Sequence, residues 1–235
     1  MSKRPAYEAI FFDMDGTLFD LSACERETVR ALLSQSAPSL APPDSEQFLD
    51  TYAALSPGRW ASGLAANASR EEIVEGIFAA VCARPGLDLI SLAGVADRYW
   101  QLFAGVAVLE PGAAETLARL ARRYRLGVIS NGYADTQRPR LAAAGLSDWF
   151  QTIVVSGEVG WAKPDPRIFA HGLAQLNVAP SVALYVGDSL SHDLAGALAA
   201  GLDFCLYRPK GGKGVALPPG TRLVTALPQL AGDLA

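Results

Sequence analysis

The sequence is poor in the residues on which several common chemistries depend. Its 235 residues include three cysteines and two histidines. Cys24, Cys82 and Cys205 lie far apart and form no C-x-x-C pair, which argues against a disulfide framework and a dithiol redox site. A nucleophilic cysteine would need a nearby histidine, and the chain offers His171 and His192 alone. We therefore expect three reduced thiols in a cytoplasmic protein.

Charge and long apolar runs are also scarce. Charged residues make up 19% of the chain and the net charge is -4, which does not provide the basic surface that a nucleic-acid polymer requires. No apolar run approaches the roughly 20 residues needed to cross a bilayer. The short polar N-terminus, residues 1–8, does not resemble a signal peptide. We expect neither a nucleic-acid polymer nor a membrane as partner, whereas a small phosphorylated ligand needs only local positive charge.

Two sequence patterns divide the chain, in which half of the residues are apolar. Residues 21–105 show helical spacing of apolar residues and no strand pattern. Within them, Ser69 to Glu72 form a capping box that predicts a helix ending near Pro85. From residue 106 onward, short apolar runs alternate with helical segments. Strands are expected at 126–129, 152–155, 182–186 and 204–207, and helices at 112–123, 134–144, 165–177 and 191–200.

This alternation predicts an α/β fold with a Rossmann-like parallel sheet and helices on both faces. A strand at residues 8–12 belongs with the strands after residue 106. We therefore expect a core of residues 1–18 and 107–235, interrupted by an all-helical cap at 19–106. A chain that leaves a core and returns to it forms a separate lid. Prolines paired with Pro or Gly are expected to interrupt the cap helices, at Pro42-Pro43, Pro57-Gly58 and Pro85-Gly86.

Two acids follow the first predicted strand. In an extended chain, Asp13 and Asp15 point to the same side. Like charges that close repel each other, so one carboxyl would be protonated unless a cation lay between them. The pair therefore predicts a metal site, an acid/base role, or both. An Asp-Gly turn is the simpler alternative, because Asp15-Gly16 is also a common turn signal.

Polar residues also follow three later strands. They are Ser130-Asn131-Gly132, Lys163-Pro164, and Gly187-Asp188 with Asp193. Ligands of open parallel sheets bind at the carboxyl ends of the strands, where these residues would meet. Each has a simpler explanation alone: an ordinary turn, a solvated lysine, an acid in a first helical turn. Their joint order at successive strand ends favours a site.

Each residue type at these strand ends suits one task. Mg²⁺ prefers carboxylate and phosphate oxygens, which Asp13 and Asp188 with a phosphorylated ligand would supply. Ser130, Lys163 and backbone amides near Gly132 can donate to phosphoryl oxygens. Asp15 then remains for proton transfer. The pattern predicts a phosphoryl-transfer site.

Together these segments resemble the four motifs of the haloacid dehalogenase (HAD) superfamily. Asp13 to Leu18 resembles the first motif, Ser130-Asn131 the second, Lys163-Pro164 the third, and Gly187-Asp188 with Asp193 the fourth. A helical cap after the first motif is also typical of that family. The resemblance implies a Mg²⁺-dependent phosphomonoester hydrolase that forms an aspartyl-phosphate intermediate.

The resemblance also implies a role for each motif residue. Asp13 would be the nucleophile and Asp15 the general acid/base. The phosphate-binding residues would be Ser130, Asn131 and Lys163. The Mg²⁺ ligands would be Asp13, the backbone carbonyl of Asp15, and Asp188, with Asp193 supporting the metal site.

Several activities within and beyond this family stay open. True dehalogenases lack the acid found here at Asp15, and phosphonate-cleaving members use a cap lysine, which residues 19–106 do not contain. The segment from Ser130 to Gln137 looks most like nucleoside 5'-monophosphate phosphatases. Phosphoglycolate, acylneuraminate and sugar phosphate phosphatases, phosphomutases, and a non-catalytic phospholigand-binding protein are the alternatives. Arg59 and Trp60 are candidate substrate residues in the cap. The cap is also rich in aromatic residues to which a nucleotide base would offer a flat face: Tyr52, Trp60, Phe78, Tyr99, Trp100 and Phe103.

Overall fold

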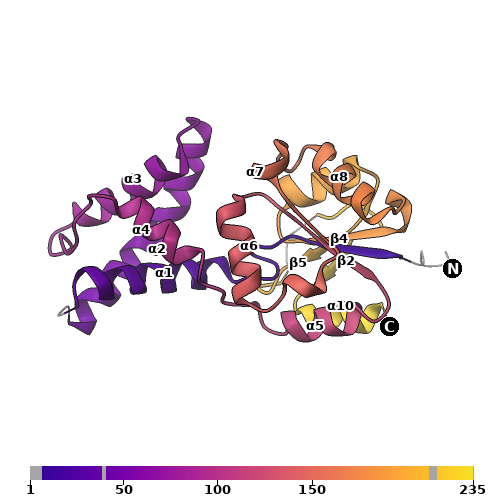
Figure 1. Ribbon diagram of the computed structural model, residues 1–235, viewed down its shortest axis with the longest axis horizontal. Coiled ribbons are helices and arrows are strands. Elements are labelled where there is room, and N and C mark those ends of the chain that lie inside the picture. The colour runs from indigo at the N-terminus through magenta and orange to yellow at the C-terminus, as the bar shows by residue number, and fades with distance from the viewer. Residues whose placement is uncertain (1–6, 39–40, 212–215, 235) are drawn as a thin grey trace. The chain divides into compact units, whose positions relative to one another are not determined.

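The computed structural model describes residues 7–38, 41–211 and 216–234 (Figure 1). Most of the segment on which the expectation of no signal peptide rests therefore lies outside the described residues. The chain forms two compact units, Met1–Leu21 with Ala107–Ala235, and Ser22–Val106. In the part of the chain that the structure describes, no helix combines the length and the apolar character needed to span a bilayer.

The first unit contains a six-stranded sheet in the order β3-β2-β1-β4-β5-β6, with every neighbouring pair parallel. The strands are β1 (Ala9–Phe12), β2 (Arg125–Ser130), β3 (Thr152–Val155), β4 (Ala183–Gly187), β5 (Asp203–Tyr207) and β6 (Arg222–Val224). The predicted α/β fold is thus confirmed. The edge strand β6 was not predicted, because three residues with one apolar side chain buried carry no periodic signal.

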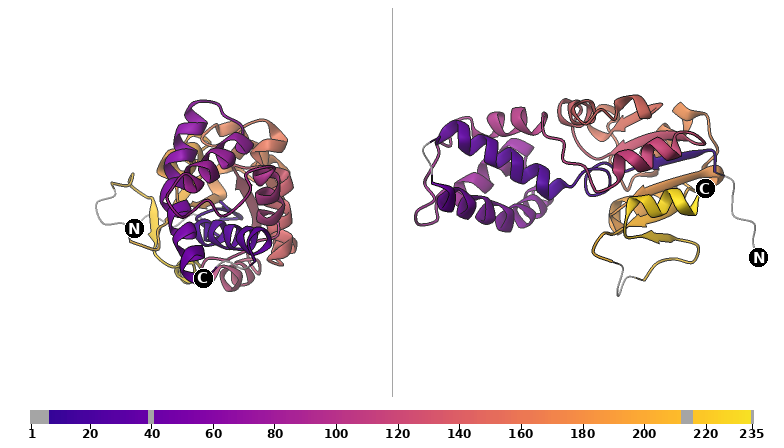
Figure 2. Two further views of the ribbon diagram at one scale, coloured as in Figure 1. Left: turned by 90° about the vertical axis from the view of Figure 1, so that its left-hand side faces the viewer. Right: turned by 90° about the horizontal axis from the view of Figure 1, so that it is seen from below.

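Helices cover both faces of this sheet (Figure 1). Helices α8 and α9 pack on one face, and α5 and α10 lie side by side on the other, as Figure 2 also shows. The helices of this unit are α5 (Ala113–Leu120), α6 (Ala134–Ala143), α7 (Ser156–Val159), α8 (Pro166–Leu176), α9 (Ala195–Ala199) and α10 (Leu227–Asp233). The helix predicted at 191–200 is divided into a π-helical segment η3 (Leu190–Leu194) and α9. Short α7 and the terminal α10 were not predicted.

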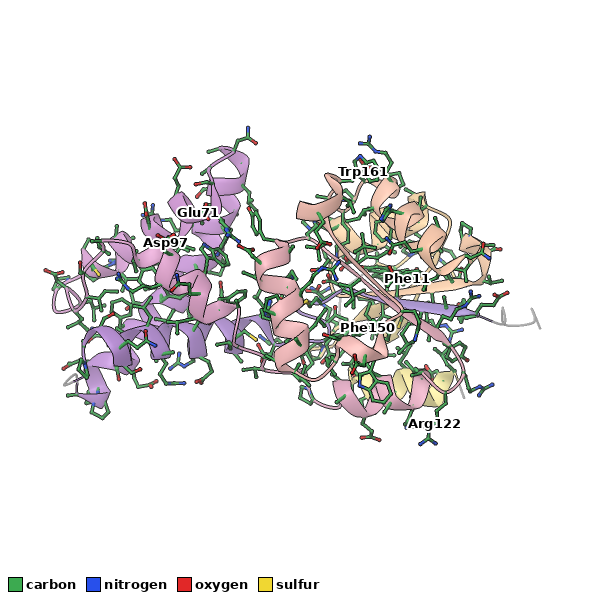
Figure 3. The ribbon with its side chains drawn as sticks, viewed as in Figure 1. Phe11, Glu71, Asp97, Arg122, Phe150 and Trp161 are labelled. Carbon is green, nitrogen blue, oxygen red and sulfur yellow. The ribbon has the colours of Figure 1, made fainter. Side chains whose placement is uncertain are left out.

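The centre of the core lies at β1, between β2 and β4. Phe11 is fully buried there, while Arg122 points outward (Figure 3). A Cβ atom added at Gly127, opposite on β2, would lie 2.6 Å from the Phe11 ring. This close approach requires a glycine opposite Phe11 and so favours the observed register of β1 and β2. The register in turn sets the position of the residues that follow β1.

The described residues of the second unit form four helices. They are α1 (Leu21–Ser36), α2 (Pro42–Ala65), α3 (Arg70–Cys82) and α4 (Val95–Phe103). The predicted capping box is present: Ser69 accepts from the Glu72 amide, and the Glu72 carboxylate accepts from the Ser69 amide. The prediction of a break at Pro57-Gly58 is wrong, because α2 continues through it. An interior proline costs a helix about 3 kcal/mol; burial of Phe48 and Tyr52 along the same helix offsets it.

Aromatic side chains form the interior of this helical unit. Tyr52, Phe78, Tyr99 and Phe103 are buried, and Tyr99 stacks on Phe103 with ring centroids 5.8 Å apart. A tilted contact of 5.2 Å joins Tyr52 to Phe78. Such pairs are packing contacts of a small core. These four rings are therefore not exposed for stacking on a ligand.

Candidate active site

Asp13 is the first residue after β1 and lies at the carboxyl edge of the sheet. Its backbone amide donates to the Val186 carbonyl at 2.8 Å, which continues the pairing of β1 with β4. Its side chain is almost completely buried. The sheet thus places this carboxylate between the ends of β2 and β4, as the pattern of strand ends predicts.

Lys163 joins the acids that follow β1 and β4. Its Nζ atom lies 2.5 Å from Asp13 Oδ1 and 2.7 Å from Asp193 Oδ1, and it donates to Tyr185 Oη at 3.0 Å. Burial acts to lower the pKa of Lys163, but the Asp13 and Asp193 carboxylates outweigh that effect and leave the pKa raised. The lysine is therefore a buried ammonium ion.

The backbone of Lys163 is held by Asn131. The Asn131 amide group donates to the Lys163 carbonyl at 3.0 Å, and the Lys163 backbone amide donates to Asn131 Oδ1 at 2.7 Å. The Gly132 amide, which the sequence suggested as a phosphate donor, instead donates to Ser156 Oγ at 3.0 Å. The Asn131 side chain thus orients Lys163, and the Gly132 amide serves the turn after β2.

Three carboxylates gather around this single ammonium. One oxygen each of Asp13, Asp188 and Asp193 lies within 4.8 Å of the others. Burial raises the pKa of Asp13 to about 8, against the lowering effect of Lys163, and burial followed by the charge of Asp193 raises the pKa of Asp188 to about 6. The donor set is hard oxygen with excess negative charge, which fits Mg²⁺. A divalent cation would compensate the negative charges whose burial, with their mutual repulsion, raises both pKa values.

Gly16 allows Asp188 to approach the loop after β1. Its φ angle is +84°, and a Cβ atom there would lie 2.7 Å from Asp188 Oδ2. The loop is closed by the Gly16 amide, which donates to the Phe19 carbonyl at 2.8 Å. Position 16 thus requires glycine for two reasons: its backbone conformation is unfavourable for other residues, and a side chain there would collide with a candidate metal ligand.

We expect Gly16→Ala to weaken Mg²⁺ binding by about 10- to 100-fold, because the new methyl group displaces Asp188. Titration calorimetry of the purified protein measures this. Gly145→Ala is the matched control: its φ angle is +67°, but a Cβ there meets no atom within 4 Å. Equal Mg²⁺ affinity in the two variants would contradict the role assigned to Gly16.

Asp15 faces a different set of partners from Asp13. Arg140 of α6 forms an ion pair with Asp15 Oδ1 at 2.7 Å, and Gln137 Nε2 donates to Asp15 Oδ2 at 2.8 Å. The same Gln137 Nε2 donates to Ser130 Oγ at 2.8 Å. The Asp15 carboxylate therefore faces α6 and Ser130, and the two acids of the first motif belong to neighbouring but distinct clusters.

The remaining candidates lie in the helical unit. The structure places Arg59 and Trp60 inside α2, where the sequence suggested a segment bounded by prolines. Arg59 is exposed, and Trp60 makes an edge contact of 6.1 Å with Trp100. Their part in substrate binding stays a prediction.

Sequence reasoning did not identify Arg140 and Tyr185 as members of the site. Tyr185 Oη accepts from Lys163 Nζ and donates to the Ile129 carbonyl at 2.8 Å. Both residues are fully buried. Tyr185 falls in an apolar strand, and Arg140 is one of two arginines in its helix, so neither has a local sequence signal.

Comparison with known proteins identifies the family of this chain. A family model described as haloacid dehalogenase-like hydrolase matches residues 7–201. The pyrimidine 5'-nucleotidase YjjG of Escherichia coli K12 is 31% identical over 200 residues, which cover 85% of each chain. The ribulose-1,5-bisphosphate 5-phosphatase of Halopiger xanaduensis is also 31% identical, over 206 residues that cover 86% of this chain and 84% of the relative.

Among solved structures, the HAD-hydrolase YfnB of Bacillus subtilis matches with a TM-score of 0.75 and 26% identity. The match covers 97% of this chain and 98% of that one. That crystal structure is described as bound to magnesium and as revealing interdomain movement. The similarity extends over both units of the present chain.

Proposed function

The chain belongs to the haloacid dehalogenase-like hydrolase family and is a phosphatase-type hydrolase, and we propose that it cleaves small phosphomonoesters with Mg²⁺ through an aspartyl-phosphate on Asp13. The observation that carries this proposal is the Lys163 ammonium bonded to both Asp13 and Asp193, with Asp188 beside them. A buried nucleophile, a cation for phosphoryl oxygens and a carboxylate set for a metal lie within one cluster.

In the first step, an Asp13 oxygen attacks phosphorus and the bond from phosphorus to the leaving oxygen breaks. Asp15 gives its proton to the leaving alkoxide, which departs as an alcohol. Lys163 and the Ser130 hydroxyl donate to the phosphoryl oxygens. Asn131 stays in the phosphate-binding set as the residue that holds Lys163 in place.

In the second step, water attacks the phosphorus of the aspartyl-phosphate. Asp15, now a carboxylate, takes a proton from this water, and the bond from phosphorus to Asp13 breaks. Phosphate leaves and both acids return to their starting states. The helical unit, Ser22–Val106, is proposed to exclude bulk water during both steps, as a cap does.

The metal would be held by the side chains of Asp13 and Asp188 and the backbone carbonyl of Asp15, with Asp193 in support. When bound, Mg²⁺ supplies positive charge that offsets the negative charge of the phosphoryl oxygens and of Asp13. The magnesium in the YfnB structure supports this choice of metal.

Two alternative functions, dehalogenation and phosphate binding without catalysis, predict the loss of acids that this chain retains. The acid at Asp15 favours phosphoryl transfer over dehalogenation. A non-catalytic phosphate-binding protein would have lost one of the motif acids, and Asp13, Asp15, Asp188 and Asp193 are all present. Release of phosphate from a generic aryl phosphate separates an enzyme from such a binding protein.

For the substrate, we expect nucleoside 5'-monophosphates to have higher kcat/KM values than phosphoglycolate. The segment Ser130 to Gln137 and the nucleotidase named among the relatives support this. Six aromatic residues of the cap suggested stacking on a nucleotide base. Four of them are buried in the core of the helical unit, so the expectation of base stacking now rests on Trp60 and Trp100. The measurement is phosphate release across nucleotides, sugar phosphates and phosphoglycolate.

A tenfold advantage of phosphoglycolate or a sugar phosphate over every nucleotide, about 1.4 kcal/mol of transition-state preference, would exclude the nucleotidase proposal. The bisphosphate phosphatase among the relatives makes sugar bisphosphates the natural comparison substrates. The phosphatase proposal itself would survive that result.

A further inference from the structure

We propose that Gln137 and Arg140 of α6 are positioning residues for proton transfer: together they hold the Asp15 carboxylate and tie it to the phosphate-binding Ser130. This inference rests on the proposed phosphatase function. The two side chains lie three residues apart and therefore on the same side of the helix.

Arg140 is a fully buried cation that pairs with the Asp15 carboxylate. Its guanidinium lies 2.7 Å from Asp15 Oδ1 and stacks over the Phe19 ring at 4.9 Å. Phe19 belongs to the same loop as Asp15, and the Gly16 amide donates to its carbonyl. Removing a charge from water is costly unless a partner compensates it. The arginine thus anchors both the carboxylate and the loop that presents it.

Gln137 joins the acid to the phosphate-binding hydroxyl. Its Nε2 atom donates to Asp15 Oδ2 and to Ser130 Oγ, at 2.8 Å in each case. Its Oε1 atom accepts from Arg140 Nη1 at 3.1 Å. Since arginine only donates, this contact sets which end of the amide faces Arg140, and Nε2 must face the acid and the hydroxyl.

The arrangement has a consequence for Ser130. Because Gln137 already donates to Ser130 Oγ, the hydroxyl hydrogen is directed away from Gln137. It makes a long hydrogen bond of 3.4 Å to the Asn131 carbonyl, which a phosphoryl oxygen can replace. One amide therefore sets the direction of the phosphate donor and the location of the proton-transfer group. A displacement of about 1 Å in such a group can lower a rate about 100-fold.

The dependence of the rate on the leaving group tests this role. A poor alkoxide leaving group needs the proton from Asp15, whereas 4-nitrophenolate leaves without it. Because Asp15 also takes a proton from water when the aspartyl-phosphate is hydrolysed, only the first step separates the two substrates, and the quantity compared is the single-turnover rate of leaving-group release. We expect Arg140→Met and Gln137→Met to lower this rate for an alkyl phosphate by about 100-fold, within the usual range for general acid catalysis. For release of 4-nitrophenolate from 4-nitrophenyl phosphate, the loss in this single-turnover rate should stay below about tenfold. Arg140→Lys should restore part of the alkyl activity.

Arg138→Met is the matched control. Arg138 lies on the same helix, is exposed and pairs with Glu158. It should leave both rates unchanged. Circular dichroism and thermal melting show whether each variant folds, and if Arg140→Met does not, Arg140→Lys and Gln137→Met decide the question.

A double variant distinguishes positioning from general damage. If Arg140 acts through Asp15, adding Arg140→Met to Asp15→Asn should change single-turnover phosphoryl transfer from 4-nitrophenyl phosphate by less than about twofold. Equal losses on alkyl and aryl substrates, additive losses in the double variant, or a higher kcat in Arg140→Met would overturn the inference. A wild-type protein that hydrolyses neither substrate would instead refute the proposed function.

Discussion

Asp13→Asn is expected to abolish phosphate release while preserving the fold. An amide of nearly the same shape is a poor nucleophile and a weak metal ligand, so kcat should fall by about 10⁴-fold or more. The fold should persist because Lys163 keeps Asp193 as an ion-pair partner. Phosphate release under saturating substrate, together with circular dichroism, measures both parts.

Asp148→Asn serves as the control for this substitution, because Asp148 is an exposed acid outside the site. A beryllofluoride adduct on Asp13, observed in the wild type and absent from Asp13→Asn, would support the covalent step directly. Near wild-type turnover in a folded Asp13→Asn protein would refute the aspartyl-phosphate mechanism.

Removal of divalent metal should abolish activity reversibly. Loss of a cation that stabilises the phosphoryl charge by several kcal/mol lowers kcat by at least about a thousandfold. Mg²⁺ should restore the rate after the chelator is removed. Ca²⁺ should inhibit, because it accepts more ligands at longer distances and would hold Asp13 away from the line of attack. Full activity in excess chelator would contradict the metal assignment.

The same site makes the stability of the metal-free protein dependent on pH. The pKa values of Asp13 and Asp188 are raised in the fold to about 8 and about 6. An acid with a raised pKa contributes its stability below its unfolded pKa and loses it as the pH rises through the folded value. Melting temperatures in chelator should therefore fall between about pH 5 and 9.

Mg²⁺ should reverse this loss, because a cation compensates the ionised carboxylates. The rise in melting temperature on adding Mg²⁺ should grow across the same pH window. In Asp13→Asn, which removes the group with the higher pKa, the fall above about pH 7 should be smaller than in the wild type. Identical pH slopes in both proteins would show that Asp13 does not titrate as assigned.

Features that depend on residues close together in the sequence could be predicted, whereas features that depend on contacts between distant segments could not. Strand and helix alternation after residue 106 is a local pattern of apolar spacing, and it predicted the parallel sheet. The polar residues at strand ends are also local, and the parallel sheet brings Asp13, Lys163 and Asp188 to one edge. The capping box at Ser69 was visible for the same reason, since its bonds span three residues.

Elements that depend on packing were missed or misplaced. Helix α2 continues across Pro57 because burial along the helix outweighs a local signal to stop. Most of the aromatic residues that suggested a base-binding surface pack against one another. The sequence could not show this, because amphipathic spacing does not distinguish a ring in the core from a ring that faces a ligand. Strand β6 is defined by its pairing with β5 at the edge of the sheet, which is a long-range contact.

The sequence by itself determined the fold class and which polar residue types follow the strands, because both depend on residue type and on spacing along the chain. Only the tertiary structure decided which partners those residues have. It placed Arg140, 125 residues away in sequence from Asp15, beside that carboxylate, and Tyr185 beneath Lys163. Such partners are chosen by the packing of α6 and β4 in three dimensions, for which the local sequence contains no signal.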